Sequence, residues 1–194
     1  MKLKGKKIGI FIEGDFYEHE IWYYHYRFPE EGADLHFFTR LWGNESLTFQ
    51  GHEYKAPFSC NESFENIDDK ELATYSAIIV PSAMVSDRLR YSEDVNKKPP
   101  ALEFLERAFA NKNIVKGIIC HGLWLVSRSP ELVAGRSLTC HNNLIGDALA
   151  YGAKYTDEDV VVDEDKNMGL LVTGRSGGHA HLFASKMIEI LAEK

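Results

Sequence analysis

A cysteine at the end of a short apolar run has the clearest potential for covalent chemistry in this chain. Cys120 closes the run "IVKGIIC" (114–120), and His121 and Gly122 follow it directly. An abrupt change from strand to helix exposes a nucleophile on a sharp turn, where nearby backbone N–H groups can stabilise an oxyanion. The partial positive charge of a helix N-terminus also lowers the pKa of a thiol. The pattern therefore predicts a nucleophilic thiolate, against the alternative of a small buried residue that only packs.

Alternating strands and helices are predicted to position this cysteine. Residues 16–28 have apolar side chains at helical spacing between two β-rich runs, and such a βαβ unit implies a parallel sheet. We expect an α/β fold, a doubly wound, mostly parallel sheet with helices on both faces, in which ligands bind at the carboxyl ends of the strands. The expected strands are 7–12, a run after Gly32, 76–81, 114–120, 135–141, 159–163 and 169–174, and further helices are expected at 100–111 and 181–194.

Two segments interrupt the alternation. Residues 41–66 are polar and aromatic, with a short strand expected in "HEYKAP", and are interpreted as a hairpin or loop insertion. Residues 86–100 are polar and charged and are expected to form a surface loop. Neither segment is long enough to fold independently, so 1–194 is expected to form a single domain.

The charge of the chain excludes some partners. The 194 residues include 29 acidic and 22 basic side chains, for a formal net charge of −7. An acidic surface does not favour nucleic acid or an anionic membrane. The apolar run at the N-terminus is too short for a signal peptide and no stretch can cross a bilayer, so a cytoplasmic location is expected.

The cysteines and histidines do not suggest a metal site. Cys60, Cys120 and Cys140 contain no CxxC pair, so neither a disulfide framework nor a structural zinc site is expected. His179 and His181 lie two residues apart near a predicted helix start and do not share a helical face. We expect no metal and no cofactor.

Four segments together carry a resemblance to a known family. "AIIVPSA", "GIICHG", "GRSLTCHNNLIGDALAYGA" and "DEDVVVDEDKNMGLLVTGR" resemble the PfpI/ThiJ family of intracellular protease-like proteins, in the class I glutamine amidotransferase-like superfamily. The resemblance extends from Ile8 to about Leu191. It implies a flavodoxin-like fold and a homodimer or higher homo-oligomer. It also implies one of the family's activities, which include peptidase, glyoxalase and deglycase chemistry, isonitrile hydration, and chaperone or redox-sensing roles.

The resemblance assigns roles around the cysteine. It implies that Cys120 is the nucleophile and that His121 assists it and donates a backbone N–H to the oxyanion. Ser82 and Ala83 stand where many relatives have two glycines, and an amide near Ala83 would complete the oxyanion hole. His141 corresponds to a position close to the cysteine pocket, although it could also be an ordinary histidine at a strand end.

The resemblance leaves the acid partner open. Relatives have a glutamate beside the cysteine sulfur, in a pattern like "FED.EL". An ungapped match puts Tyr17 at this position, and one extra residue in the preceding loop would bring Glu18 there instead. We expect Glu18, because a phenol is a poor proton shuttle near neutral pH. The match keeps Phe16, Glu20, Arg27 and Gly32 in place.

The last loop also differs from the family pattern. His179 and His181 stand where many relatives have an aspartate and a proline, and we expect His179 to line the pocket together with Tyr17 and Ser82. The function expected is a cysteine-dependent hydrolase, glyoxalase or deglycase acting on a small carbonyl or amide substrate. The alternative is a non-catalytic redox sensor or chaperone-like oligomer with an oxidisable Cys120.

Overall fold

A six-stranded sheet forms the centre of the computed structural model, which describes all 194 residues. Five strands are parallel, and the edge strand β9 runs antiparallel to β10. The prediction of a doubly wound, mostly parallel sheet is confirmed. The strand order is β2 (Asp34–Phe38), β1 (Lys7–Phe11), β5 (Tyr75–Val80), β6 (Val115–Ile119), β10 (Gly169–Gly174) and β9 (Val160–Asp165).

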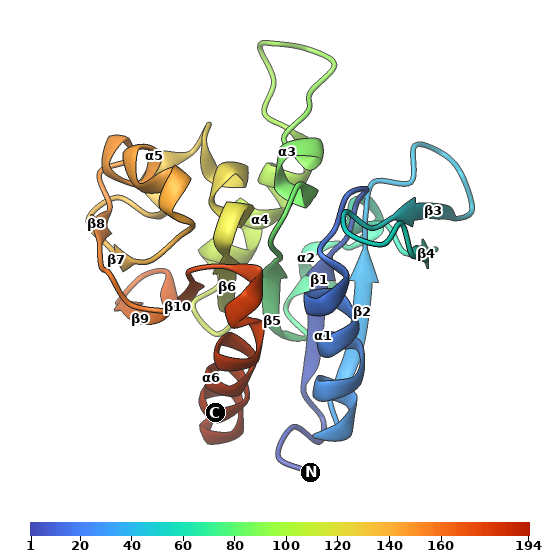
Figure 1. Cartoon of the computed structure of the whole chain (residues 1–194), viewed down its shortest axis with the longest axis horizontal. Helices are drawn as coiled ribbons and strands as arrows, with labels where there is room; N and C mark the ends of the chain where they lie inside the picture. The colour runs from blue at the N-terminus through green and yellow to red at the C-terminus, as the bar shows by residue number, and fades with distance from the viewer.

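Helices cover both faces of this sheet (Figure 1). On the face turned to the viewer, α1 (Glu18–Glu30) and α6 (Ala180–Glu193) lie side by side. α2 (Asp69–Leu72) and α4 (Pro100–Ala110) cover the opposite face. Phe104 of α4 packs edge-on against Phe11 and Phe38 of the sheet, with ring centroids 5.7 and 5.2 Å apart. Because the central strands are covered on both faces, they are continuous apolar runs.

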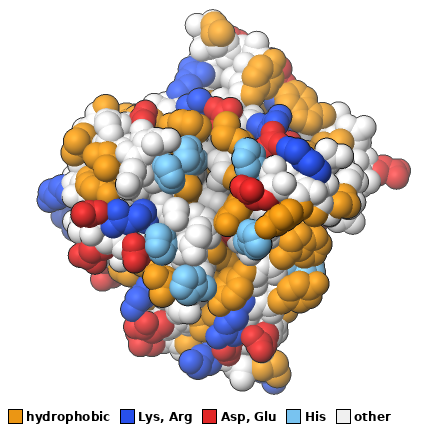
Figure 2. All heavy atoms as spheres, viewed as in Figure 1, with side chains coloured by type: hydrophobic (Ala, Val, Ile, Leu, Met, Phe, Trp, Pro, Cys, Tyr) orange, Lys and Arg blue, Asp and Glu red, His pale blue; other side chains and the backbone are white.

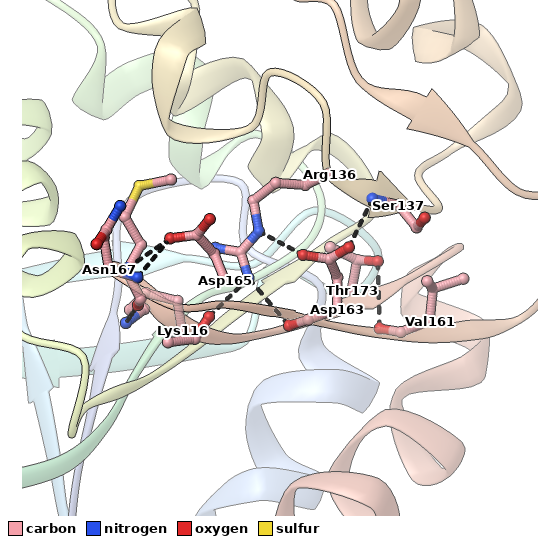
Figure 3. Close-up of polar contacts among 10 residues, drawn as sticks. Lys116, Arg136, Ser137, Val161, Asp163, Asp165, Asn167 and Thr173 are labelled. Atoms are coloured by element: carbon pink, nitrogen blue, oxygen red, sulfur yellow. Dashed lines mark hydrogen bonds and ion pairs between the residues drawn. The ribbon is translucent and has the colours of Figure 1, made fainter.

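The strand expected at 135–141 is much shorter and lies outside the main sheet. β7 (Ser137–Leu138) pairs with β8 (Lys154–Tyr155) in a separate two-stranded sheet next to α5 (Ile145–Ala150). The reason is Arg136, whose buried side chain donates to the Asp163 carboxylate at 2.7 Å and to the carbonyls of Asp163 and Gly169 (Figure 3). The segment is therefore held against β9 and β10 by a side chain instead of by a backbone ladder.

The 41–66 segment contains an antiparallel hairpin. Its strands are β3 (Leu47–Gln50) and β4 (Pro57–Cys60), so the short strand expected in "HEYKAP" is instead the loop between them. Phe58 attaches the hairpin to the body of the protein through Phe16 and Phe37, with ring centroids 5.9 and 4.8 Å apart. The 86–99 segment, which begins within the short α3 (Val85–Leu89), extends away from the sheet (Figure 1).

The two ends of the sheet differ in composition. Both termini lie at the amino end of the parallel strands, whereas the loops that follow β1, β5, β6 and β10 gather at the carboxyl end (Figure 1). None of the helices combines the length and the apolar character that a membrane span requires. The carboxyl end is the place where open α/β sheets bind ligands.

Candidate active site

Cys120 occupies a strained turn directly after β6. Its φ of 59° lies in the left-handed region, which costs a non-glycine residue about 1–2 kcal/mol. The chain then enters a 3₁₀ helix, Cys120–Val126, where sequence periodicity had suggested an α-helix. A Cβ on Gly122 would lie 2.8 Å from the carbonyl oxygen of Val80, so only glycine lets the turn pack this closely on β5. The strain therefore holds the thiol at the carboxyl edge of the sheet.

His121 is the immediate polar partner of the thiol. Its Nδ1 lies 3.2 Å from the Cys120 Sγ, and its carbonyl accepts a hydrogen bond of 2.5 Å from the Ser86 hydroxyl. The His141 ring lies 4.7 Å from the His121 ring, between centroids. Burial, with a smaller contribution from His141, lowers the pKa of His121. His121 is therefore a neutral imidazole near pH 7, able to accept a proton.

Burial raises the pKa of the Cys120 thiol to about 11. Hydrogen bonds from the backbone of Gly177, His121 and Ala83 lower it, and the charge of Glu20 raises it further. The sequence-based expectation of a lowered pKa is wrong, because the side chain is only 6% exposed and the short 3₁₀ helix does not outweigh this desolvation. The resting residue is a thiol, and its proton must leave when it attacks.

Three backbone amides converge on this sulfur. Ala83 has a φ of 57°, so it adopts the left-handed conformation that many relatives were expected to reach with glycine. Gly177 approaches from the loop after β10, and a Cβ there would lie 2.5 Å from the Tyr17 ring and 2.6 Å from the Ser82 hydroxyl. With the N–H of His121, these groups act on Sγ from three separate loops. Such a group of donors can stabilise negative charge on sulfur or on a nearby substrate oxygen.

A cavity of about 350 Å³ opens beside Cys120. Figure 2 shows histidine side chains around a hollow in this face of the molecule. No group of three or more His, Cys, Asp or Glu side chains in the structure is arranged to hold a metal ion. The cavity is lined by Tyr17, His52, Glu53, Ser82, Ala83, Met84, Cys120, His121, His141, Ser176, Gly177 and Gly178.

The structure corrects the expectation for Glu18. Its carboxylate accepts hydrogen bonds from the backbone N–H groups of Glu53 and Tyr54, at 2.9 and 2.8 Å. It does not line the Cys120 cavity, whereas Tyr17 does. No shift of register occurs, because α1 begins at Glu18 with Tyr17 as its N-cap, which leaves Tyr17 facing the cavity.

The acid that acts on Cys120 is Glu20, which sequence reasoning missed. Glu20 is fully buried, and one of its oxygens accepts hydrogen bonds from the backbone N–H and the hydroxyl of Ser82. Desolvation outweighs these bonds and raises the pKa of Glu20 to about 7. The signal was present in the sequence, since Glu20 lies one helical repeat before Tyr24 and Phe28 on the buried face of α1.

The remaining expected residues divide into two groups. Ser82, Ala83 and His141 line the cavity as expected. His179 does not, because its ring turns away to the Ser176 hydroxyl at 2.9 Å and toward Asp159. His52 and Glu53 belong to the cavity but could not be identified from the sequence, because they reach it from the loop of the β3–β4 hairpin.

A second cavity, of about 470 Å³, lies along α1. Its walls include Trp22, Tyr23 and Tyr26, the outward-facing part of the aromatic cluster, whose Tyr24 and Phe28 are buried in the core. It contains no cysteine and none of the amides that surround Sγ. The chemistry of the molecule is therefore concentrated at Cys120.

Comparisons with known proteins agree with this geometry. The DJ-1/PfpI family model matches residues 6–190. A curated relative, protein/nucleic acid deglycase 2 of Escherichia coli (strain K12), is 27% identical over 186 residues, which are 96% of this chain and 98% of the relative. General stress protein 18 of Bacillus subtilis (strain 168) is 26% identical, over 96% of this chain and 98% of its own length.

Solved structures share the fold. The match with a two-domain protein of Anabaena variabilis, which contains DJ-1/ThiJ/PfpI-like and ferritin-like domains, has a TM-score of 0.79 and an identity of 21%. It covers 96% of this chain and 48% of the other. These similarities concern the whole sheet and its helices.

Proposed function

Because the chain belongs to the DJ-1/PfpI family, we propose that it is a cysteine-dependent enzyme that acts on a small carbonyl compound, in the manner of a deglycase. The observation that carries the proposal is the Cys120 turn, where Sγ lies 3.2 Å from the His121 Nδ1 beside a cavity of about 350 Å³. The printed name of the Escherichia coli relative supports this chemistry. A cavity near the lower end of the range for ligand sites favours a small substrate over an extended peptide.

His121 is the base in this proposal. The thiol pKa is raised to about 11 and that of His121 is lowered, so the proton rests on sulfur before substrate binds. As sulfur approaches the carbonyl carbon, the thiol proton passes to Nδ1 of His121. The carbonyl electron pair moves to oxygen, and the N–H groups of Ala83, His121 and Gly177 stabilise the charge that develops.

The adduct then rearranges without an external oxidant. With a 2-oxoaldehyde, attack on the aldehyde carbon gives a thiohemiacetal beside a ketone. The hydrogen on that carbon leaves as a proton and the neighbouring ketone carbon gains one, which gives a thioester with an adjacent hydroxyl. Water hydrolyses the thioester to a hydroxy acid and restores the thiol. If the aldehyde is bound to an amine as a hemiaminal, the C–N bond breaks as the S–C bond forms and the amine leaves protonated.

Glu20 and Ser82 form the proton reserve of the site. The Ser82 hydroxyl lines the cavity and donates to the Glu20 carboxyl group, whose pKa is near 7. A buried acid that titrates near neutral pH can supply and recover a proton during the rearrangement. Glu20 lies behind Ser82 and reaches the substrate only through it, so it is a positioning residue.

The alternative is an oxidisable sensor. The same three amides would stabilise a Cys120 sulfinate, which favours this use of the site. Against it, the thiolate is the form that peroxide attacks, and burial of Cys120 raises its pKa. We therefore prefer the enzyme.

Turnover with matched variants tests the proposal. Methylglyoxal and its hemiaminal with Nα-acetyllysine are incubated with wild type, Cys120→Ser and Cys60→Ser, and hydroxy acid and free amine are measured. We expect turnover by wild type and Cys60→Ser and none by Cys120→Ser, since Cys60 is buried against the Phe37 carbonyl away from the cavity. Absence of turnover by wild type, together with peroxide oxidation of Cys120 ahead of Cys60 and Cys140, would favour the sensor.

A further inference from the structure

Glu18 holds a loop in place. Its side chain is 2% exposed, and each carboxylate oxygen accepts a backbone N–H of the hairpin loop: Oε2 that of Glu53 at 2.9 Å and Oε1 that of Tyr54 at 2.8 Å. Burial raises the pKa of Glu18, but these hydrogen bonds outweigh it and the pKa lies below its ordinary value. The carboxylate is therefore bound in its charged form.

The neighbouring backbone is shaped around this carboxylate. A Cβ on Gly51 would lie 2.1 Å from the Glu18 carboxyl group, so Glu18 can reach the loop only beside a glycine. The N–H of His52 donates to the Phe16 carbonyl at 2.8 Å, and Phe16 and Gly51 form an isolated parallel bridge. Residues 51–54 are thus attached both to the start of α1 and to the residue before it.

This loop separates the two cavities. His52 and Glu53 face the Cys120 cavity, whereas Tyr54 lines the aromatic cavity along α1. Among the twelve residues that line the Cys120 cavity, Glu53 is the one carboxylate, and there is no lysine or arginine. The remaining ionisable groups are the Cys120 thiol, the Tyr17 phenol and the imidazoles of His52, His121 and His141. The fixed charge that an entering molecule meets at the wall is therefore negative.

We propose that Glu18 is a positioning residue that holds loop 51–54 as one wall of the Cys120 cavity, and that Glu53 on this wall selects neutral or cationic carbonyl compounds, namely carbonyl adducts of amines, over compounds with a carboxylate beside the reacting carbon. The part that concerns substrates rests on the proposed function. The part that concerns the charge of the wall rests on the geometry alone, because it governs any reagent that approaches Sγ.

Alkylation of Cys120 tests the wall without requiring turnover. Iodoacetamide is neutral and iodoacetate is anionic, and mass spectrometry of the Cys120 peptide gives the ratio of the two rates relative to the same ratio for free cysteine. Using the ratio removes any change in thiol pKa. We expect wild type to disfavour iodoacetate, and Glu53→Gln to raise the relative iodoacetate rate by about threefold or more at low salt. High salt should reduce the difference.

Glu18 variants test the positioning role. Glu18→Ala releases both N–H groups, so the relative iodoacetate rate should rise as in Glu53→Gln. Glu18→Gln keeps one acceptor and the size of the side chain and should give an intermediate ratio, which retains the test if Glu18→Ala does not fold. Glu30→Gln is the matched control on the same helix, since Glu30 is exposed and distant from the Cys120 cavity. It should leave the ratio unchanged.

Steady-state kinetics separate the two proposals. With neutral methylglyoxal and anionic glyoxylate as the pair, Glu18→Ala should raise KM for methylglyoxal by about tenfold and leave kcat within about threefold, because the wall binds substrate and does not touch the reacting atoms. Glu53→Gln should raise the kcat/KM of glyoxylate relative to methylglyoxal. If wild type turns over neither compound, the proposed function fails while the alkylation ratio still decides the wall. An alkylation ratio that is the same in wild type and Glu53→Gln would overturn the inference.

Discussion

The buried carboxyl group of Glu20 accepts both the backbone N–H and the hydroxyl of Ser82. Ser82 therefore has two functions at once, since its hydroxyl also lines the cavity beside Cys120. The other Glu20 oxygen and the Tyr24 hydroxyl have no hydrogen-bond partner in the protein, although both are buried. A single serine thus connects the substrate cavity to an ionisable group inside the core, and this connection gives the first two predictions.

Replacing Glu20 by glutamine should change how stability depends on pH. Because burial raises the Glu20 pKa from 4.5 to about 7, the folded protein keeps a proton that the unfolded chain has lost, so stability from this group is present below pH 4.5 and is lost as pH rises through 7. The gain in unfolding free energy of Glu20→Gln over wild type should therefore be larger above pH 7 than at pH 4.5, by roughly 3 kcal/mol. Urea denaturation across this range measures it, and equal curves for both proteins would contradict the shift.

Replacing Ser82 by alanine should reduce turnover more than substrate binding. The variant removes the hydroxyl between the cavity and Glu20 but keeps the backbone N–H bond. We expect kcat to fall by about tenfold to a hundredfold with little change in KM, within the usual contribution of a proton-transfer group. Ser82→Thr, which keeps the hydroxyl, should recover part of the rate, and full activity in Ser82→Ala would exclude this route.

The histidine pair should determine the acid limb of the pH–rate profile. His121 must be neutral to accept the thiol proton, and since its pKa is lowered, kcat/KM should rise to its plateau below pH 6.5. His141→Gln removes the nearby imidazole that contributes to this lowering, so the acid limb should move to higher pH. His121→Gln should lower kcat/KM by about a hundredfold or more. An unchanged acid limb in His141→Gln would show that the two rings do not interact.

Gly122 should tolerate no side chain. A Cβ would meet the Val80 carbonyl at 2.8 Å, and the backbone cannot yield without moving Cys120. We expect Gly122→Ala to lower the unfolding free energy by about 1–3 kcal/mol and to slow alkylation of Cys120. Gly146→Ala is the control, because nothing lies within 4 Å of its added Cβ. Similar denaturation midpoints for the two variants would contradict the close packing.

Arg136 should be one of the most costly residues to remove. Its side chain is buried, and Figure 3 shows it directed at Asp163, whose other carboxylate oxygen accepts the N–H of Ser137 at 2.9 Å. Arg136→Ala leaves a carboxylate and two carbonyls unpaired, so a loss of about 3–5 kcal/mol is expected from chemical denaturation. Lys186→Ala, which removes an exposed pair with Glu189, should cost under about 0.5 kcal/mol. A small loss at Arg136 would mean that β7 is held by other contacts.

Local patterns determined the framework of the fold and the position of the nucleophile. Strand and helix periodicity over a few residues identified the strands of the main sheet, and the abrupt end of "IVKGIIC" put Cys120 at the carboxyl edge. The same periodicity contained Glu20 on the buried face of α1, although the resemblance to a family motif directed attention to Glu18. The strand at 135–141 was overestimated, because its β-rich composition did not reveal the buried Arg136 that separates it from the main sheet.

Tertiary structure alone decided which groups act on the sulfur and in what state. The pKa values of Cys120 and Glu20 follow from burial by residues distant in the sequence, which a sequence pattern cannot measure. His52 and Glu53 reach the cavity because the Glu18 carboxylate fixes the hairpin loop more than thirty residues away. The sequence thus determined where the thiol lies, since that depends on neighbours along the chain, whereas desolvation and long-range hydrogen bonds decided its partners.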